Sequence, residues 1–236
     1  MALPKLNTAR YETTIPSSGR AVEYRPYLVK EEKILMIALE SQDQKQVLKA
    51  VKDVIESCVF DEINVNNLAI FDVESLFISL RSKSVGEGVD VNVKCEECNG
   101  ENQHKVDLAE IAIPEIKDQE KNIMLTGDVG VTMRYPSFED MENIEGEGLQ
   151  SVEGIMNLIS NCVDSVYDKD SVYKGSDQSE NEMTEFVESL NSEQFQKLSD
   201  WFEGMPAISH TIKFDCISCK AHNEQEFRLD HTRMQS

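Results

Sequence analysis

The chain has 236 residues, 40% of them hydrophobic, and its 44 acidic and 23 basic side chains give a formal charge of −21. This length allows one large domain or two small ones, and either can bury a hydrophobic core. Because a charge of −21 repels phosphate, direct nucleic-acid binding would need a local basic patch, and the sequence has only a weak one.

The sequence also argues against a membrane span. Its longest apolar run, Ile34 to Leu39, has six residues, whereas a membrane helix needs about 20. The opening residues, MALPKLNTARYETT, lack the apolar stretch of a signal peptide. We therefore expect a reducing compartment, in which cysteines bind metal or lie buried rather than form disulfides.

Residues 1–30 are predicted to form an extended N-terminal arm. They carry five basic and two acidic side chains, a net charge of +3. Pro4, Pro16, Gly19 and Pro26 favour turns over a helix in this segment.

Residues 31–88 are predicted to be helical. We expect Asp72 to be the N-cap of the last helix in this region. Apolar side chains recur at the helical period in two stretches, which are Val47, Leu48, Val51, Val54, Ile55 and Cys58, and then Val73, Leu76, Phe77 and Leu80.

Residues 89–135 are predicted to form β-hairpins. Alternating valines from Val89 to Val93 indicate a strand that leads into a first CxxC pair, Cys95 and Cys98. A second hairpin, from Ile123 to Tyr135, turns at an intervening Gly-Asp pair.

Residues 136–206 are predicted to form an acidic helical region. Residues 139–203 carry 17 acidic and three basic side chains, a net charge of −14. Apolar residues from Leu149 to Val166 repeat at spacings of three and four, which predicts one amphipathic helix. The polar segment 168–182 is predicted to be a mobile loop.

Residues 207–236 are predicted to form another hairpin, with Cys216 and Cys219 at its tip. Two hairpin tips that each offer two thiolates are typical of a zinc ribbon, in which the Zn–S bonds are about 2.3 Å long. Because 117 residues separate the two pairs, tertiary structure would have to bring them together. We therefore expect an α+β protein, mostly helical with two or more β-hairpins, two of which form a discontinuous zinc-ribbon-like clasp around a structural Zn²⁺.

Other interpretations of these cysteines stay open. His222 or His104 would replace one cysteine in a Cys₃His site, or the site would hold no metal. A redox pair is disfavoured because it should open a helix, and both pairs follow strand-like sequence. Cys58 and Cys162 lie on apolar helix stripes and are interpreted as core thiols.

The sequence contains no familiar catalytic motif. It lacks the GxxxxGK[ST] phosphate loop, GxGxxG, the GxSxG elbow and HExxH. Acidic clusters such as Glu139, Asp140 and Glu142 are interpreted as solvated faces rather than cation sites. We therefore predict that the protein is not an enzyme.

Four stretches resemble a known family. They are Pro16-Ser-Ser-Gly-Arg20, Tyr24-Arg-Pro-Tyr27, Lys30 to Ser41, and Trp201-Phe-Glu-Gly-Met-Pro206 before the last strand and CxxC. Through them the sequence resembles the baseplate hub family of contractile-tailed phages of the T-even type. The segment 168–182 has no counterpart, and Trp201 stands where Phe is expected.

The resemblance implies a non-enzymatic part in the central hub of a phage tail baseplate, as a structural component or as an assembly factor. It implies a location in the host cytoplasm during assembly or in the tail baseplate of the virion. The implied partners are other hub or tail proteins or a second copy of the chain. Arg20, Arg25 and Tyr27 match the motif and are expected to bind a partner. An alternative of equal weight is that Arg25 and Tyr27 hold the arm against its own domain through Glu31 or Glu32.

A second hypothesis comes from a different class of protein. An acidic zinc-ribbon adaptor or inhibitor of a nucleic-acid-processing complex would use its carboxylates as a phosphate mimic. That function requires acidic side chains spaced along one ordered surface, whereas many of them lie in the predicted loop.

Overall fold

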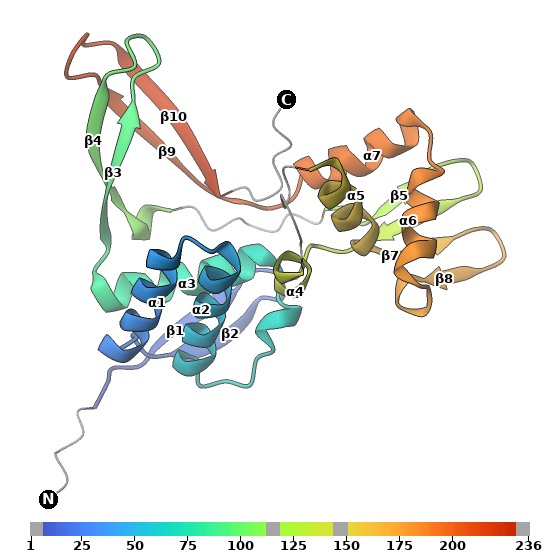
Figure 1. Cartoon of the computed structure of the whole chain (residues 1–236), viewed down its shortest axis with the longest axis horizontal. Helices are drawn as coiled ribbons and strands as arrows, with labels where there is room; N and C mark the ends of the chain where they lie inside the picture. The colour runs from blue at the N-terminus through green and yellow to red at the C-terminus, as the bar shows by residue number, and fades with distance from the viewer. Residues whose placement is uncertain (1–6, 112–118, 144–150, 230–236) are drawn as a thin grey trace, which may run out of the picture. The chain divides into compact units, whose positions relative to one another are not determined.

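The computed structural model describes residues 7–111, 119–143 and 151–229. Residues 1–6 and 230–236 of the predicted end segments, and Leu149, lie outside the described residues. The chain forms two compact units (Figure 1). Unit 1 comprises Met1–Val65, Phe71–Glu115 and Ala207–Leu229; unit 2 comprises Asn66–Ile70, Ile116–Pro206 and Asp230–Ser236.

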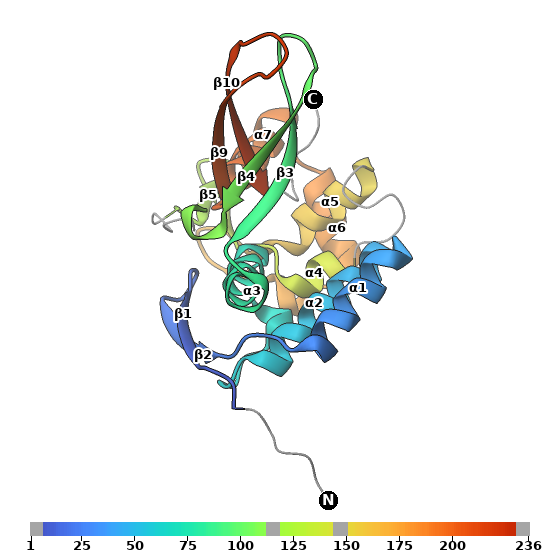
Figure 2. The ribbon, with the colours of Figure 1, turned by 90° about the vertical axis from the view of Figure 1, so that its left-hand side faces the viewer.

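Unit 1 begins with a short hairpin and three helices. These elements are β1 (Tyr11–Ile15), β2 (Arg20–Tyr24), α1 (Val29–Ser41), α2 (Gln44–Cys58) and α3 (Ile70–Val85). The two strands pair antiparallel, and Gly19, with φ of 66°, occupies the turn. Figure 2 shows α1 and α2 side by side.

The segment predicted as an extended arm is therefore tied into unit 1. Ile15, Val22 and Tyr24 are buried, and the backbone N–H and hydroxyl of Ser17 donate to the carboxylate of Asp72. The prediction that Asp72 caps α3 is wrong, because α3 begins two residues earlier and the buried carboxylate accepts from the β1–β2 turn instead.

The rest of unit 1 consists of two further hairpins. The first pairs β3 (Gly88–Lys94) with β4 (Glu101–Asp107), and the second pairs β9 (Ile208–Asp215) with β10 (His222–Leu229). A small apolar cluster of Val93, Val106 and Ile212 is buried here, with Val91 and Phe214 packed against it. Since an isolated two-stranded hairpin is marginally stable at best, these hairpins need another source of stability.

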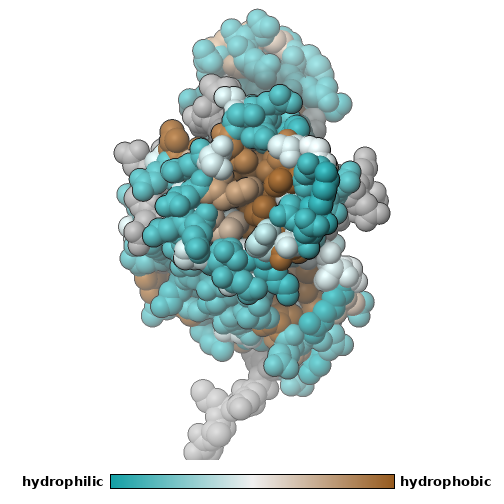
Figure 3. Space-filling model, turned by 90° about the vertical axis from the view of Figure 1, so that its right-hand side faces the viewer, coloured by the Kyte–Doolittle hydropathy of each residue, from teal (hydrophilic) through white to brown (hydrophobic). Residues whose placement is uncertain are grey.

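Unit 2 is a four-stranded antiparallel sheet with helices. Trp201 is buried in its core, stacks on Tyr135 and donates from Nε1 to the carbonyl of Glu120. Figure 3, which looks onto this unit, shows apolar residues surrounded by hydrophilic ones. The strands, in sheet order, are β5 (Asn122–Met124), β6 (Gly130–Met133), β7 (Val163–Tyr167) and β8 (Val172–Lys174), and the helices are α4 (Phe138–Glu142), α5 (Val152–Asn161), α6 (Glu180–Glu188) and α7 (Ser192–Glu203).

Two sequence predictions in unit 2 differ from the structure. The helix expected from Leu149 to Val166 ends at Asn161, and Val163–Tyr167 forms β7. Val163 belongs to the core of unit 2 and the half-buried Val166 packs against it, so a strand also covers the apolar side chains of this segment. In segment 168–182, for which we predicted a mobile loop, the structure has β8, a 3₁₀ turn and the start of α6.

The described residues thus form a mixed α and β structure, with seven α-helices and several small antiparallel sheets. In the part of the chain that the structure describes, no helix has the length and apolarity needed to cross a membrane.

Candidate metal centre

The tips of the β3–β4 and β9–β10 hairpins bring four cysteines together. The sulfur atoms of Cys95, Cys98, Cys216 and Cys219 all lie within 4.8 Å of one another. Cys95 Sγ is 3.6 Å from Cys219 Sγ, and Cys98 Sγ is 3.6 Å from Cys216 Sγ. Around a tetrahedral ion with bonds of about 2.3 Å, sulfurs would be about 3.8 Å apart, so this arrangement can hold a metal ion.

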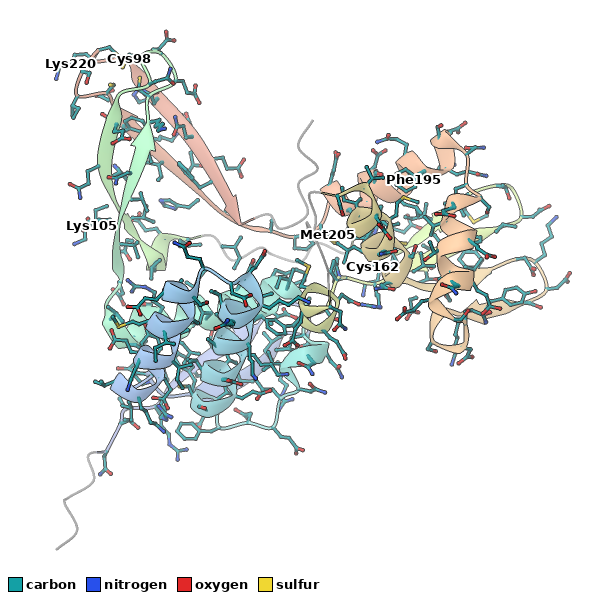
Figure 4. The ribbon with its side chains drawn as sticks, viewed as in Figure 1. Cys98, Lys105, Cys162, Phe195, Met205 and Lys220 are labelled. Carbon is teal, nitrogen blue, oxygen red and sulfur yellow. The ribbon has the colours of Figure 1, made fainter. Side chains whose placement is uncertain are left out.

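The backbone of each tip forms the same turn. The N–H of Cys95 donates to the carbonyl of Gly100, and the N–H of Cys216 donates to that of Ala221. The residue after each second cysteine, Asn99 or Lys220, adopts a left-handed conformation with φ of 55° or 63°. Figure 4 shows Cys98 and Lys220 together at this end of the hairpins. The turn aims both thiols of each tip toward the same point.

Two buried asparagines connect the tips to each other. Asn102 accepts the backbone N–H of Ile217 and directs Nδ2 at Cys216 Sγ, 3.7 Å away. Asn223 does the reciprocal, accepting the N–H of Glu96 and directing Nδ2 at Cys95 Sγ, 3.5 Å away. Each side chain from one hairpin thus holds the cysteine turn of the other hairpin. We did not predict these residues.

A signal for the asparagines was nonetheless present in the sequence. Both tips read C-x-x-C-x-x-x-N, from Cys95 to Asn102 and from Cys216 to Asn223. Two hairpins with the same spacing and the same hydrogen bonds form a short internal repeat with approximate two-fold symmetry.

The electrostatics of the four thiols favour a bound cation. Backbone N–H groups, first that of Cys219, lower the pKa of Cys216 to about 6, and the N–H of Cys98 is the main cause that lowers the pKa of Cys95. The N–H of Gly100 lowers the pKa of Cys98, but the neighbouring sulfurs outweigh it and raise that pKa to about 12. Four thiolates would repel one another, and a divalent cation removes that repulsion.

The remaining candidate ligands lie elsewhere. His222 pairs through Nδ1 with Asp215 at 3.0 Å, and its side chain is exposed. His104 lies on β4, directly across from Val91. Neither joins the cluster found among the described residues. Cys58 and Cys162 are buried, and burial raises the pKa of Cys58 to about 11.

The residues expected to bind a partner have contacts within unit 1. Arg25 donates to the carboxylate of Glu31 at 2.9 Å and to the carbonyl of Ser57, and Tyr27 is buried. Arg20 is exposed and donates to the carbonyl of Glu62. The contacts of Arg25 agree with the alternative in which it pins the arm through Glu31. A partner-binding role for the three residues stays a prediction.

Comparison with protein families decides the broader identity. The profile of the family described as T4 bacteriophage base plate protein matches residues 8–230. The chain belongs to this family. The resemblance inferred from the sequence is thereby confirmed, and the match takes in both units and both cysteine hairpins of this baseplate protein. Searches of curated proteins and of solved structures found no significant match.

Proposed function

We propose that the chain is a non-enzymatic structural component or assembly factor of the central hub of a phage tail baseplate. In this proposal a structural zinc ion stabilises the chain, which docks on other hub or tail proteins through its N-terminal segment. The observation that carries the proposal is the family match over residues 8–230.

Zinc fits the donor set best among common metals. Four cysteine sulfurs at tetrahedral spacing form a closed site, which suits a structural ion and leaves no position for a catalytic water. The weak hydrophobic core between the hairpins gives such an ion a clear role, because metal binding to a site formed only on folding contributes to folding free energy.

Metal analysis of the purified full-length protein tests the zinc site. We expect about one zinc per chain, and less than about half an equivalent would contradict the proposal. Cys98→Ser should lose the ion. Cys58→Ala is the matched control, because Cys58 is buried away from the cluster, and it should keep the full equivalent.

The place in the hub needs separate experiments. Deleting the N-terminal segment would remove the buried Ile15, Val22 and Tyr24 and unfold unit 1, so a surface substitution is the better test. Arg20→Glu should weaken co-purification with hub proteins while leaving the circular dichroism unchanged. Unchanged co-purification would argue against docking through this segment, and mass spectrometry of virions would show whether the protein remains in the particle.

A further inference from the structure

Helix α1 carries apolar side chains on its exposed sides as well as on its covered side. Glu31 and Ala38 are its buried residues. Ile34, Met36, Ile37 and Leu39 are 44 to 63% exposed. Clustered exposed apolar residues mark interaction sites. Figures 1 and 2 show α1 at the outside of the helical part of unit 1.

The face of α1 opposite its buried side has a simple charge pattern. At about 100° per residue, Lys33, Met36, Ile37 and Glu40 share this face. Lys33 and Glu40 are seven residues apart, about 10.5 Å along the axis, so they are too far apart to pair with each other. Among the residues that the structure describes, neither takes part in an ion pair.

This pattern is complementary to itself. A two-fold axis between Met36 and Ile37 would place a second α1 antiparallel, with Lys33 opposite Glu40 of the second copy and Glu40 opposite its Lys33. The same register brings Met36 and Ile37 of both copies together at the centre of the contact, with Ile34 and Leu39 at its two edges. An isologous contact of this kind is the commonest basis of a homodimer.

The distribution of charge favours the same surface. The chain as a whole carries −21, but residues 7–60 contain eight basic and eight acidic side chains, a net charge of zero. Two copies that approach each other through residues 7–60 avoid most of the repulsion between the acidic residues in the rest of each chain.

We infer that the exposed face of α1 is a self-association surface, on which a second copy of the chain docks antiparallel. This inference does not depend on the zinc site or on the hub assignment. A 13-residue helix spans only about 20 Å, so the interface is small and the expected dissociation constant is micromolar rather than nanomolar.

Sedimentation velocity of the full-length protein over roughly 1 to 300 µM tests this surface. We expect a reversible monomer–dimer equilibrium. Met36→Glu should weaken dimerisation by about tenfold or more, because it places a charge in the apolar centre. Val152→Glu, which makes the same change at a side chain of unit 2 that is 79% exposed, should leave it unchanged. A chain that is monomeric at every concentration overturns the inference.

A charge swap tests the register and separates a second copy from any other occupant. Lys33→Glu and Glu40→Lys should each weaken dimerisation by about five- to tenfold, since each change creates two like-charge contacts per dimer. The double variant restores both pairs in the dimer and should return to within about threefold of the original affinity. A double variant as weak as the singles would overturn the antiparallel arrangement.

Discussion

Asn102 and Asn223 hold the cysteine turns in position without being metal ligands themselves. Each is buried and hydrogen-bonds across to the other hairpin. We predict that Asn102→Ala or Asn223→Ala weakens zinc affinity by about 10- to 100-fold, the usual effect of losing a group that orients a ligand. Competition with a chromophoric chelator measures the affinity.

Two further variants separate orientation from general damage. Asn102→Asp keeps the acceptor for Ile217 N–H but replaces the donor to Cys216 Sγ by a negative charge, so it should weaken zinc at least as much as alanine does. His222→Ala removes only an exposed pair with Asp215 and should bind zinc normally. Equal affinity for all four variants would show that the asparagines do not position the site.

For single residues, the sequence predicts the role of the four cysteines more readily than that of the two asparagines. The four cysteines are recognisable because CxxC at a strand end has few structural uses, and the structure places all four together. The asparagines could be found only by comparing the two tips, since one Asn after a cysteine pair is also an ordinary turn residue. The contact between Arg25 and Glu31 joins residues six apart, and the sequence left it as one of two alternatives.

Among the elements, α1 depends on one buried ion pair at its start. Glu31 is 2% exposed and accepts from Arg25 and from the N–H of Leu28, which precedes the helix. We predict that Arg25→Met destabilises the protein by about 3 kcal/mol, because it leaves a buried carboxylate with too few partners. Urea unfolding followed by circular dichroism measures the change. Arg10→Met removes an exposed pair with Glu23 and should cost no more than about 1 kcal/mol.

The same pair has a definite pH dependence. Burial would raise the pKa of Glu31, but hydrogen bonds from Arg25, Leu28 and Lys30 outweigh it and lower that pKa. The unfolded carboxyl has a pKa of about 4.3, so the pair stabilises the fold fully above that pH and loses its effect as the pH falls through the lower, folded value. The difference in stability between the original chain and Arg25→Met should therefore shrink below about pH 4. A constant difference would contradict this role.

Prediction of the elements succeeded where the pattern was local. The CxxC hairpins and the helix that ends at Cys58 follow from alternation or helical spacing within each segment. The boundary between α5 and β7 could not be predicted, because apolar residues from Val152 to Val166 fit a helix stripe, while β7 forms through pairing with β6, thirty residues earlier in the chain. Long-range pairing of this kind leaves no local signal.

For the whole molecule, the single tryptophan gives a way to follow the units separately. Trp201 is the only tryptophan and is buried in unit 2, whereas the cysteine cluster lies in unit 1. We predict that chelation lowers the melting temperature of unit 1, which is seen as an earlier transition in the far-ultraviolet circular dichroism of the whole chain. The thermal transition in Trp201 fluorescence should stay in place. A fluorescence transition that shifts equally on chelation would mean that the two units unfold together.

The interleaving of the two units has a consequence for biosynthesis. Most of unit 2 is formed by Ile116–Pro206, which lies in the sequence between two segments of unit 1. During translation, Ile116–Pro206 leave the ribosome before β9 and β10 are synthesised. Unit 2 can therefore fold before the β3–β4 hairpin can pair with the β9–β10 hairpin. Residues 207–229 therefore determine when unit 1 is completed. A ribosome that stops before Ala207 would release a chain with a foldable unit 2 and two unmatched thiols, Cys95 and Cys98.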